Sequence, residues 1–221
     1  MARRRNSRAK SLRDLRRRPP KRDPYPSLLI VCEGSKTEPA YLEEIRARYE
    51  LNSANVVVAH GGRTDPGGIV EVAIERAIVD AKRGLPYDEV YVVFDQDTHP
   101  SFDQALARVR HPPRALRGKL RAVTSRPCFE YWLLLHFGYS AKPYQPTGSR
   151  SPCADLIRDL EQHVPDYEKG ASDLFARLAD RLEAAKANAE KRLVDARATN
   201  SRNPSTEMHR LVDRLQRLKR P

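Results

Sequence analysis

Four short apolar runs, each followed by a stretch of helical character or a turn, limit most strongly what this chain can fold into. They span residues 28–32, 56–59, 90–94 and 120–124. The runs are apolar on successive residues, so strands built from them must be covered on both faces, and the helices between them can supply that cover. The order βαβαβαβ therefore predicts an α/β fold with an open, mainly parallel four-stranded sheet.

The helical segments divide the chain further. Residues 37–49, 69–82 and 101–110 have apolar spacings typical of helices, and Thr37 is placed to cap the first. After a loop at 139–152, three more helices are expected near 153–163, 170–198 and 204–219, the last capped by Ser205. We therefore expect an α/β domain at 27–140 and a helical C-terminal extension at 141–221 packed on it. The apolar stripes of the extension suit an intramolecular bundle or a symmetric homodimer.

Charge is concentrated at the N-terminus. The chain of 221 residues has a formal net charge of +12, of which residues 1–22 carry +10, so the body is nearly neutral. Residues 1–26 are predicted to be a basic disordered tail. Arginine suits phosphate oxygens, so a nucleic acid, DNA or RNA, is the expected partner; a solubilising role and an anionic membrane surface are the alternatives. The arginines predicted to bind nucleic acid are Arg3, Arg4, Arg5, Arg8, Arg16, Arg17 and Arg18.

Hydropathy and cysteine usage indicate where in the cell a protein with this sequence is located. No apolar run approaches the roughly 18 residues that a membrane span needs, and no secretory signal is visible, so we expect a cytoplasmic protein without membrane contact. The three cysteines, Cys32, Cys128 and Cys153, are odd in number and far apart. Neither a disulfide framework nor a CxxC zinc site is predicted from them.

Carboxylates follow two of the predicted strands. Glu33 comes directly after the first, and Asp95 and Asp97 come after the third. Ligands of open parallel sheets bind outside the carboxyl ends of the strands, where these three side chains would converge. Oxygen ligands suit Mg2+ or Mn2+, which can activate water for phosphodiester cleavage. Alternatively, each acid only caps a turn or ends a strand.

Other polar residues give weaker signals. The segment at 34–37 lacks the adjacent Gly-Lys of a nucleotide-binding loop, so no bound nucleotide cofactor is expected, although Lys36 can contact a substrate phosphate. His99 and His136 are candidates for acid or base catalysis, although single histidines seldom have that role.

Four ordered sequence blocks resemble the RloB family. They are Val-Cys-Glu-Gly-Ser-Lys-Thr-Glu-Pro at 31–39, a block at 87–97 ending in Phe-Asp-Gln-Asp, Ser-Arg-Pro-Cys-Phe-Glu-Tyr-Trp-Leu-Leu-Leu-His-Phe at 125–137, and Asn-Pro-Ser-Thr at 203–206. The family is associated with bacterial restriction loci and abortive phage infection, often beside an AAA-type ATPase. It is similar to Toprim domains, so the resemblance implies a Toprim-like, Rossmann-like fold.

The resemblance also implies roles for the acids. Glu33 would be an acid, a base or a metal ligand, and Asp95 and Asp97 would bind Mg2+ or Mn2+. Glu130 would add a catalytic carboxylate to the same edge, or serve as a buried structural partner. The resulting prediction is a metal-dependent nuclease acting on DNA or RNA, tRNA included, in anti-phage defence. The alternative is a non-catalytic nucleic-acid-binding or regulatory subunit of an ATPase complex.

Overall fold

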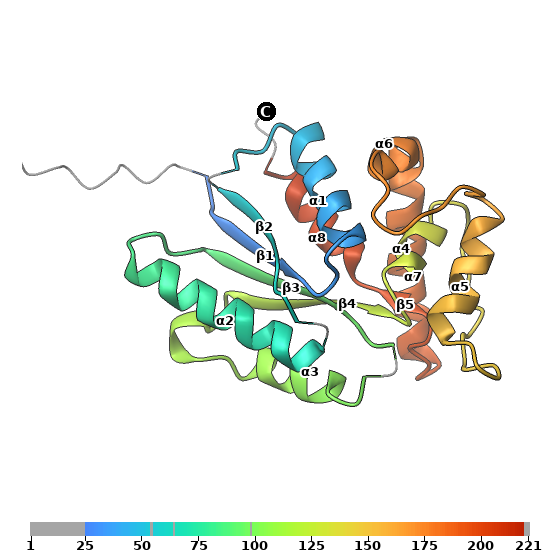
Figure 1. The fold of residues 1–221 in the computed structure, drawn as a ribbon, viewed down its shortest axis with the longest axis horizontal. Helices are drawn as coiled ribbons and strands as arrows, with labels where there is room; N and C mark the ends of the chain where they lie inside the picture. Colours follow the sequence, from blue (N-terminus) through green and yellow to red (C-terminus); the bar gives the residue numbers. More distant parts are fainter. Residues whose placement is uncertain (1–24, 54, 64, 98, 219–221) are drawn as a thin grey trace, which may run out of the picture.

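The computed structural model describes residues 25–53, 55–63, 65–97 and 99–218. It contains one five-stranded sheet, which lies at its centre (Figure 1). The strand order is β2-β1-β3-β4-β5. The strands are β1 (Leu28–Cys32), β2 (Val56–His60), β3 (Glu89–Asp95), β4 (Leu120–Arg126) and β5 (Ser205–Thr206). The first four pair in parallel, as predicted, and β5 runs antiparallel to β4.

The fifth strand corrects the sequence prediction. A four-stranded sheet was expected, with Ser205 capping the last helix; instead Ser205 pairs with Arg126, and Thr206 pairs with Ser125. The hydroxyls of Ser125 and Thr206 also lie 3.0 Å apart, within hydrogen-bond distance. Because residues 205 and 206 are held in the sheet, the last helix starts only at Met208.

Eight α-helices are present in the described part of the chain. They are α1 (Thr37–Arg48), α2 (Pro66–Lys82), α3 (Phe102–Arg110), α4 (Glu130–Leu134), α5 (Pro152–Glu161), α6 (Leu174–Leu178), α7 (Leu182–Ala198) and α8 (Met208–Gln216). Single turns of 3-10 helix lie at Arg114–Leu116 and Ala179–Arg181. The one long helix expected at 170–198 is thus divided by the second of these turns. Lys36 rather than Thr37 is the N-cap residue of α1.

A carboxylate from α1 fixes the start of α6. Glu44 accepts hydrogen bonds from the backbone N–H groups of Leu174, Phe175 and Ala176, at 2.9 to 3.3 Å. The first N–H groups of a helix have no partner inside the helix, so an external acceptor satisfies them. Glu44 therefore ties the beginning of the C-terminal helices to the helix that follows β1.

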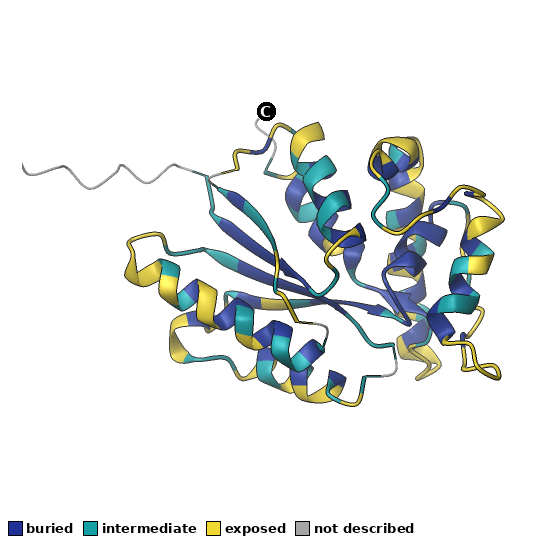
Figure 2. Cartoon of the chain, viewed as in Figure 1, coloured by how far each residue is buried: buried dark blue, intermediate teal, exposed yellow. Residues whose placement is uncertain are grey.

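Helices cover both faces of the sheet, as the uninterrupted apolar strands require. Figure 1 shows α2 and α3 on one face and α1 and α8 on the other. Leu29 and Val31 pack with α2 and α3 in one hydrophobic cluster, whereas Leu28 and Ile30 belong to a larger cluster that includes α1 and α4 to α8. All five residues of β1 are buried (Figure 2). The C-terminal helices therefore share their core with the sheet, and their apolar stripes are mostly buried within the monomer.

Two of the three cysteines form a disulfide, which contradicts the sequence prediction. Cys128 follows β4 and Cys153 lies in the first turn of α5, so 25 positions separate them in sequence. The packing of α4 against α5 brings their Cα atoms to 5.8 Å, a normal separation for a disulfide. Cys32 is a buried free thiol.

Within the part of the chain that the structure describes, every helix is too short or too polar to cross a membrane.

Candidate functional site

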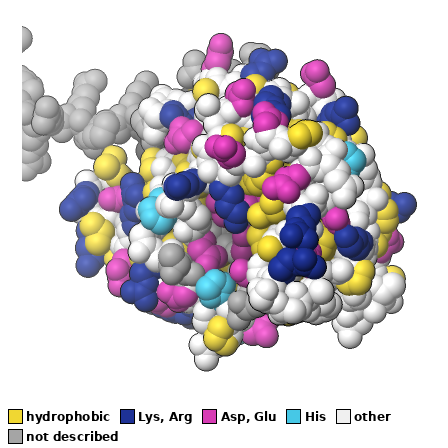
Figure 3. Space-filling model, turned by 45° about the vertical axis from the view of Figure 1, so that its right-hand side comes forward, with side chains coloured by type: hydrophobic (Ala, Val, Ile, Leu, Met, Phe, Trp, Pro, Cys, Tyr) yellow, Lys and Arg dark blue, Asp and Glu magenta, His cyan; other side chains and the backbone are white. Residues whose placement is uncertain are grey.

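A cavity of about 410 Å³ opens at the carboxyl ends of β1 and β3. Its polar lining comes from the β1–α1 turn, the end of β3 and the start of α4, together with Lys169 from the loop before α6. In Figure 3, acidic side chains lie in a hollow with Lys, Arg and His side chains around it. The acids that line the cavity are Glu33, Glu38, Asp95, Asp97 and Glu130. The topology thus brings all four sequence-predicted acids into one cavity and adds Glu38.

Glu33 directly follows β1 and is held by hydrogen bonds to the neighbouring strand β3. Its backbone N–H donates to the carbonyl of Val93, and its carboxylate accepts from the backbone N–H of Asp95 at 3.1 Å. The other carboxylate oxygen lies 3.6 Å from Nε2 of His99. Burial raises the pKa of Glu33 above its usual value, while the Asp95 N–H and His99 act in the opposite direction. Glu33 is therefore fixed in place and partly deprived of solvent.

Asp95 and Asp97 hold the end of β3 against the segment after β4. Asp95 accepts from the backbone N–H of Phe129 at 3.0 Å, and the backbone N–H of Asp97 donates to the carbonyl of Pro127. Burial, with repulsion from Glu38 and Glu130, raises the pKa of Asp95 well above its usual value. Asp97 has φ of 32°, and its buried Oδ1 has no hydrogen-bond partner among the described residues. A buried acceptor without a donor is costly, and an ion or a water bound there would satisfy it.

Glu38 is the site residue that the sequence analysis missed. It lies in the first turn of α1, an ordinary place for an acid, yet its side chain is buried. A Cβ added at Gly34 would lie 2.0 Å from its carboxylate, so glycine is required for this approach. Burial raises the pKa of Glu38 from 4.5 to about 7, with a further contribution from Glu130. A carboxyl group with such a pKa can exchange a proton at neutral pH. The signal was present in the Glu-Gly-x-x-x-Glu spacing of residues 33–38.

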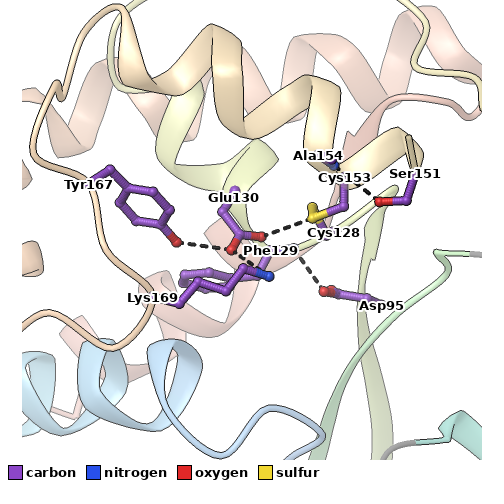
Figure 4. The surroundings of a disulfide bond; sticks show 9 residues. All are labelled: Asp95, Cys128, Phe129, Glu130, Ser151, Cys153, Ala154, Tyr167 and Lys169. Atoms are coloured by element: carbon purple, nitrogen blue, oxygen red, sulfur yellow. Dashed lines mark hydrogen bonds and ion pairs between the residues drawn. A yellow bond between two sulfur atoms is a disulfide. The ribbon is translucent and has the colours of Figure 1, made fainter. Parts of the chain in front are cut away.

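Glu130 stands on the opposite wall and is satisfied by the C-terminal half of the chain (Figure 4). It is 3% exposed, and its Oε1 accepts from Tyr167 Oη at 2.9 Å and lies 3.3 Å from Lys169 Nζ. Its Oε2 lies 3.6 Å from Cys153 Sγ. Ion pairing with Glu130 raises the pKa of Lys169 although burial opposes it. Glu130 thus has the partners of a structural carboxylate while facing the cavity with the other acids.

The donor set suits a hydrated, hard cation. Within the described ranges, the one group of three or more His, Cys, Asp or Glu donor atoms that lie within 4.8 Å of one another is Cys128, Glu130 and Cys153. Its two sulfurs are bonded to each other, so they are not thiolate ligands. Glu33, Asp95 and Asp97 share the cavity without closing into such a cage. Mg2+ retains several waters and is commonly held by one or two carboxylates and a substrate phosphate. The unpartnered Asp97 oxygen, in one cavity with Glu33 and Asp95, is a candidate ligand of this kind.

The remaining sequence candidates divide between cavity and core. Lys36 and His99 line the cavity, joined by His60, which the sequence analysis did not select. His136 does not line it: the side chain is buried against Trp132, with ring centroids 4.8 Å apart. The predicted tail arginines, Arg3 to Arg18, lie outside the described residues.

Comparison with known proteins gives one match. The sequence model of the family described as "RloB-like protein" matches residues 28–215, which is most of the chain and includes every acid of the cavity. No curated protein and no solved structure matches the chain.

Proposed function

The chain belongs to the RloB-like protein family, and from this premise we propose that it is a divalent-metal-dependent nuclease that hydrolyses phosphodiester bonds. The observation that carries the proposal is the meeting of acids from two strand ends in one cavity, with an unpartnered oxygen on Asp97. Burial raises the pKa of both Glu33 and Asp95, and repulsion from neighbouring carboxylates adds to the rise in each. A cation would relieve that repulsion.

In this proposal Asp95 and Asp97 hold Mg2+ or Mn2+, with Glu33 beside them as a further ligand or as a base. When bound, the ion supplies a nucleophilic water and neutralises charge on the phosphate. The protein's own contribution is position: the Asp95 N–H orients Glu33, and the Phe129 N–H orients Asp95. Lys36, exposed at the rim, supplies a positive charge for the substrate phosphate.

The test is cleavage of plasmid, single-stranded DNA and tRNA by the purified full chain with Mg2+ or Mn2+, and with EDTA. Cleavage is expected only with metal, and Glu33→Gln and Asp95→Asn are expected to abolish it. Glu75→Gln is the matched control, because Glu75 is an exposed acid on α2 outside the cavity. Calorimetric titration with Mn2+ in the absence of nucleic acid provides a second readout, in which Asp97→Asn should weaken binding. Full cleavage by both the Glu33 and the Asp95 variants would overturn the proposed mechanism.

A non-catalytic nucleic-acid-binding subunit is the second candidate, favoured by the extreme charge of residues 1–22. It predicts salt-dependent binding that deletion of residues 1–22 removes and Asp95→Asn leaves intact, without turnover of any substrate. The two candidates therefore differ in the same assay.

We further propose the setting that the family resemblance implies: cytoplasmic anti-phage defence with an AAA-type ATPase partner that restrains the nuclease. Co-expression with such an ATPase partner is expected to suppress the toxicity that the isolated subunit shows, and this toxicity should disappear in Glu33→Gln. Undiminished growth when the wild-type subunit is produced alone would contradict restraint by the partner. A homodimer, the other predicted assembly, is tested by sedimentation of the same preparation.

A further inference from the structure

A second cavity, of about 310 Å³, lies between α3 and α7 along the outer edge of β4. Four arginines line it: Arg110 from α3, Arg126 from the end of β4, Arg197 from α7, and Arg202 from the segment before β5. We call this cavity with its four arginines the arginine groove. Glu207 is the one acid in its lining.

Among the described residues, no carboxylate lies within ion-pair distance of the four guanidinium groups. Within the described ranges none of them forms an ion pair or a side-chain hydrogen bond, whereas Arg210 and Arg214, which line the neighbouring cavity, pair with Glu207 and Glu89. Glu207 is already engaged, because its carboxylate accepts from Thr124 Oγ1 and from Arg210. The positive charge of the arginine groove is therefore available to an external anion.

Arg126 is the most constrained of the four. Its guanidinium carbon lies 4.8 Å from the centre of the Phe102 ring, which holds the side chain over α3. Burial, together with the nearby positive charge of Arg202, lowers its pKa, and attraction from Asp103 and Glu207 only partly offsets this. Keeping two like charges close costs free energy, and an anion bound between them would recover it. Arginine forks match the oxygens of a phosphate in pairs.

The arginine groove begins beside the carboxylate cavity. Asp95 is in register with Ser125, so Arg126 is the next residue along β4, at the same edge of the sheet as the acids. The carbonyl of Pro127 then accepts from the backbone N–H of Asp97. An extended polyanion at the carboxylates can therefore cross the end of one strand and enter the arginine groove.

We propose that the arginine groove binds the phosphodiester backbone of the nucleic-acid strand whose reacting phosphate lies at Glu33, Asp95 and Asp97. This inference rests on the proposed function for the identity of the strand. It adds a second binding element, on the folded body, to the basic N-terminal segment. The contacts are to phosphates, so the arginine groove sets the path of the strand and reads no base sequence.

The test is binding, separated from cleavage. A fluorescent single-stranded oligonucleotide is titrated with the full chain in EDTA, and its anisotropy is followed over a series of salt concentrations. The test variant is Arg197→Gln/Arg202→Gln, and the control variant is Arg48→Gln/Arg158→Gln. All four arginines are exposed and lack a described side-chain partner, so both variants should fold, which circular dichroism checks.

The test variant should bind at least several-fold more weakly than the control. Each lost phosphate contact should reduce the slope of log K against log salt by about 0.7, so two lost contacts reduce it by about 1.4. Equal losses in the test and control variants would overturn the inference, since only general charge would then matter. A competition experiment with the wild-type protein gives a second check. The inference would also be overturned if polyglutamate of equal charge, or inorganic phosphate, displaced the labelled oligonucleotide as effectively as unlabelled oligonucleotide does.

The outcomes also separate this inference from the proposed function. If the test variant loses binding and the wild type shows no metal-dependent cleavage, the role of the arginine groove is supported and the nuclease proposal is refuted. If the wild type cleaves and the test variant binds as tightly as the control, the nuclease proposal is supported and the role of the arginine groove is refuted.

Discussion

Acidification is expected to destabilise the fold through His136. Nδ1 of this buried histidine lies 3.0 Å from the carbonyl oxygen of Trp132. Since a carbonyl only accepts, Nδ1 carries the proton, and the buried Nε2 faces no partner among the described residues. Protonation would place a charge on a nitrogen without an acceptor. Burial accordingly lowers the pKa of His136 from 6.5 to about 4.

Proton linkage gives the direction and the size of the change in the free energy of unfolding. At a pH between 6.5, the pKa in the unfolded chain, and about 4, the pKa in the folded protein, His136 is protonated only in the unfolded chain. The free energy of unfolding therefore falls as the pH falls below 6.5. The loss continues until the pH reaches the folded pKa of about 4. Each pKa unit corresponds to about 1.4 kcal/mol, so lowering the pH from about 7 to about 5 removes about 2 kcal/mol through His136.

The assay is urea unfolding at the two pH values, followed by circular dichroism and by the fluorescence of Trp132, the single tryptophan of the chain. His136→Asn is the comparison, because its amide can replace the Nδ1–H donor and does not titrate. The wild type should lose about 2 kcal/mol more than this variant on acidification. Other groups titrate in both proteins and cancel in the difference. Equal losses in the two proteins would refute the reasoning.

Three other perturbations test separate parts of the structure. Reducing the disulfide should lower the free energy of unfolding by about 3.5 kcal/mol, because the unfolded chain regains the entropy of a loop between positions 25 apart. Urea unfolding with and without reductant measures this loss. The control variant Cys128→Ala/Cys153→Ala should not respond to reductant. Glu44→Ala should cost about 1 to 2 kcal/mol in the same assay, because three N–H groups of α6 lose their acceptor, and an unchanged midpoint would contradict the capping role. Gly34→Ala should slow metal-dependent cleavage roughly tenfold to a hundredfold, because the added methyl group displaces the Glu38 carboxylate, while the melting temperature stays nearly unchanged. Full activity of this variant would show that cleavage does not depend on the position of the Glu38 carboxylate beside Gly34.

The sequence was sufficient for the regular part of the fold. Uninterrupted apolar runs specify strands buried on both faces, and all four predicted strands are present and parallel. The strand β5 could not be found this way, because two polar residues, Ser205 and Thr206, have no periodicity and are held by pairing with β4. The start of α6 at Leu174, after the predicted start at 170, could not be found, because the carboxylate that satisfies its first N–H groups belongs to Glu44, about 130 residues away in sequence.

The candidate site divides in the same manner. Glu33, Asp95 and Asp97 were found because strand ends in a parallel sheet converge by topology alone. Glu38 was missed, since the start of a helix is an ordinary place for an acid. The partners of Glu130 were also unpredictable: Tyr167 and Lys169 lie in an irregular loop whose position depends on the packing of the C-terminal helices.

The contribution of the C-terminal helices to the sheet and to the site has a consequence for synthesis. Domains generally fold as units, the N-terminal ones first, while the ribosome is still adding residues. Here the strands β1 to β4 emerge first, but β5, α8 and the partners of Glu130 come from the last third of the chain. A nascent chain that ends before α8 lacks residues of the larger hydrophobic cluster. The hydrophobic core behind the cavity is therefore complete only when nearly the whole polypeptide has left the ribosome, so truncated products lack the packing that positions the site.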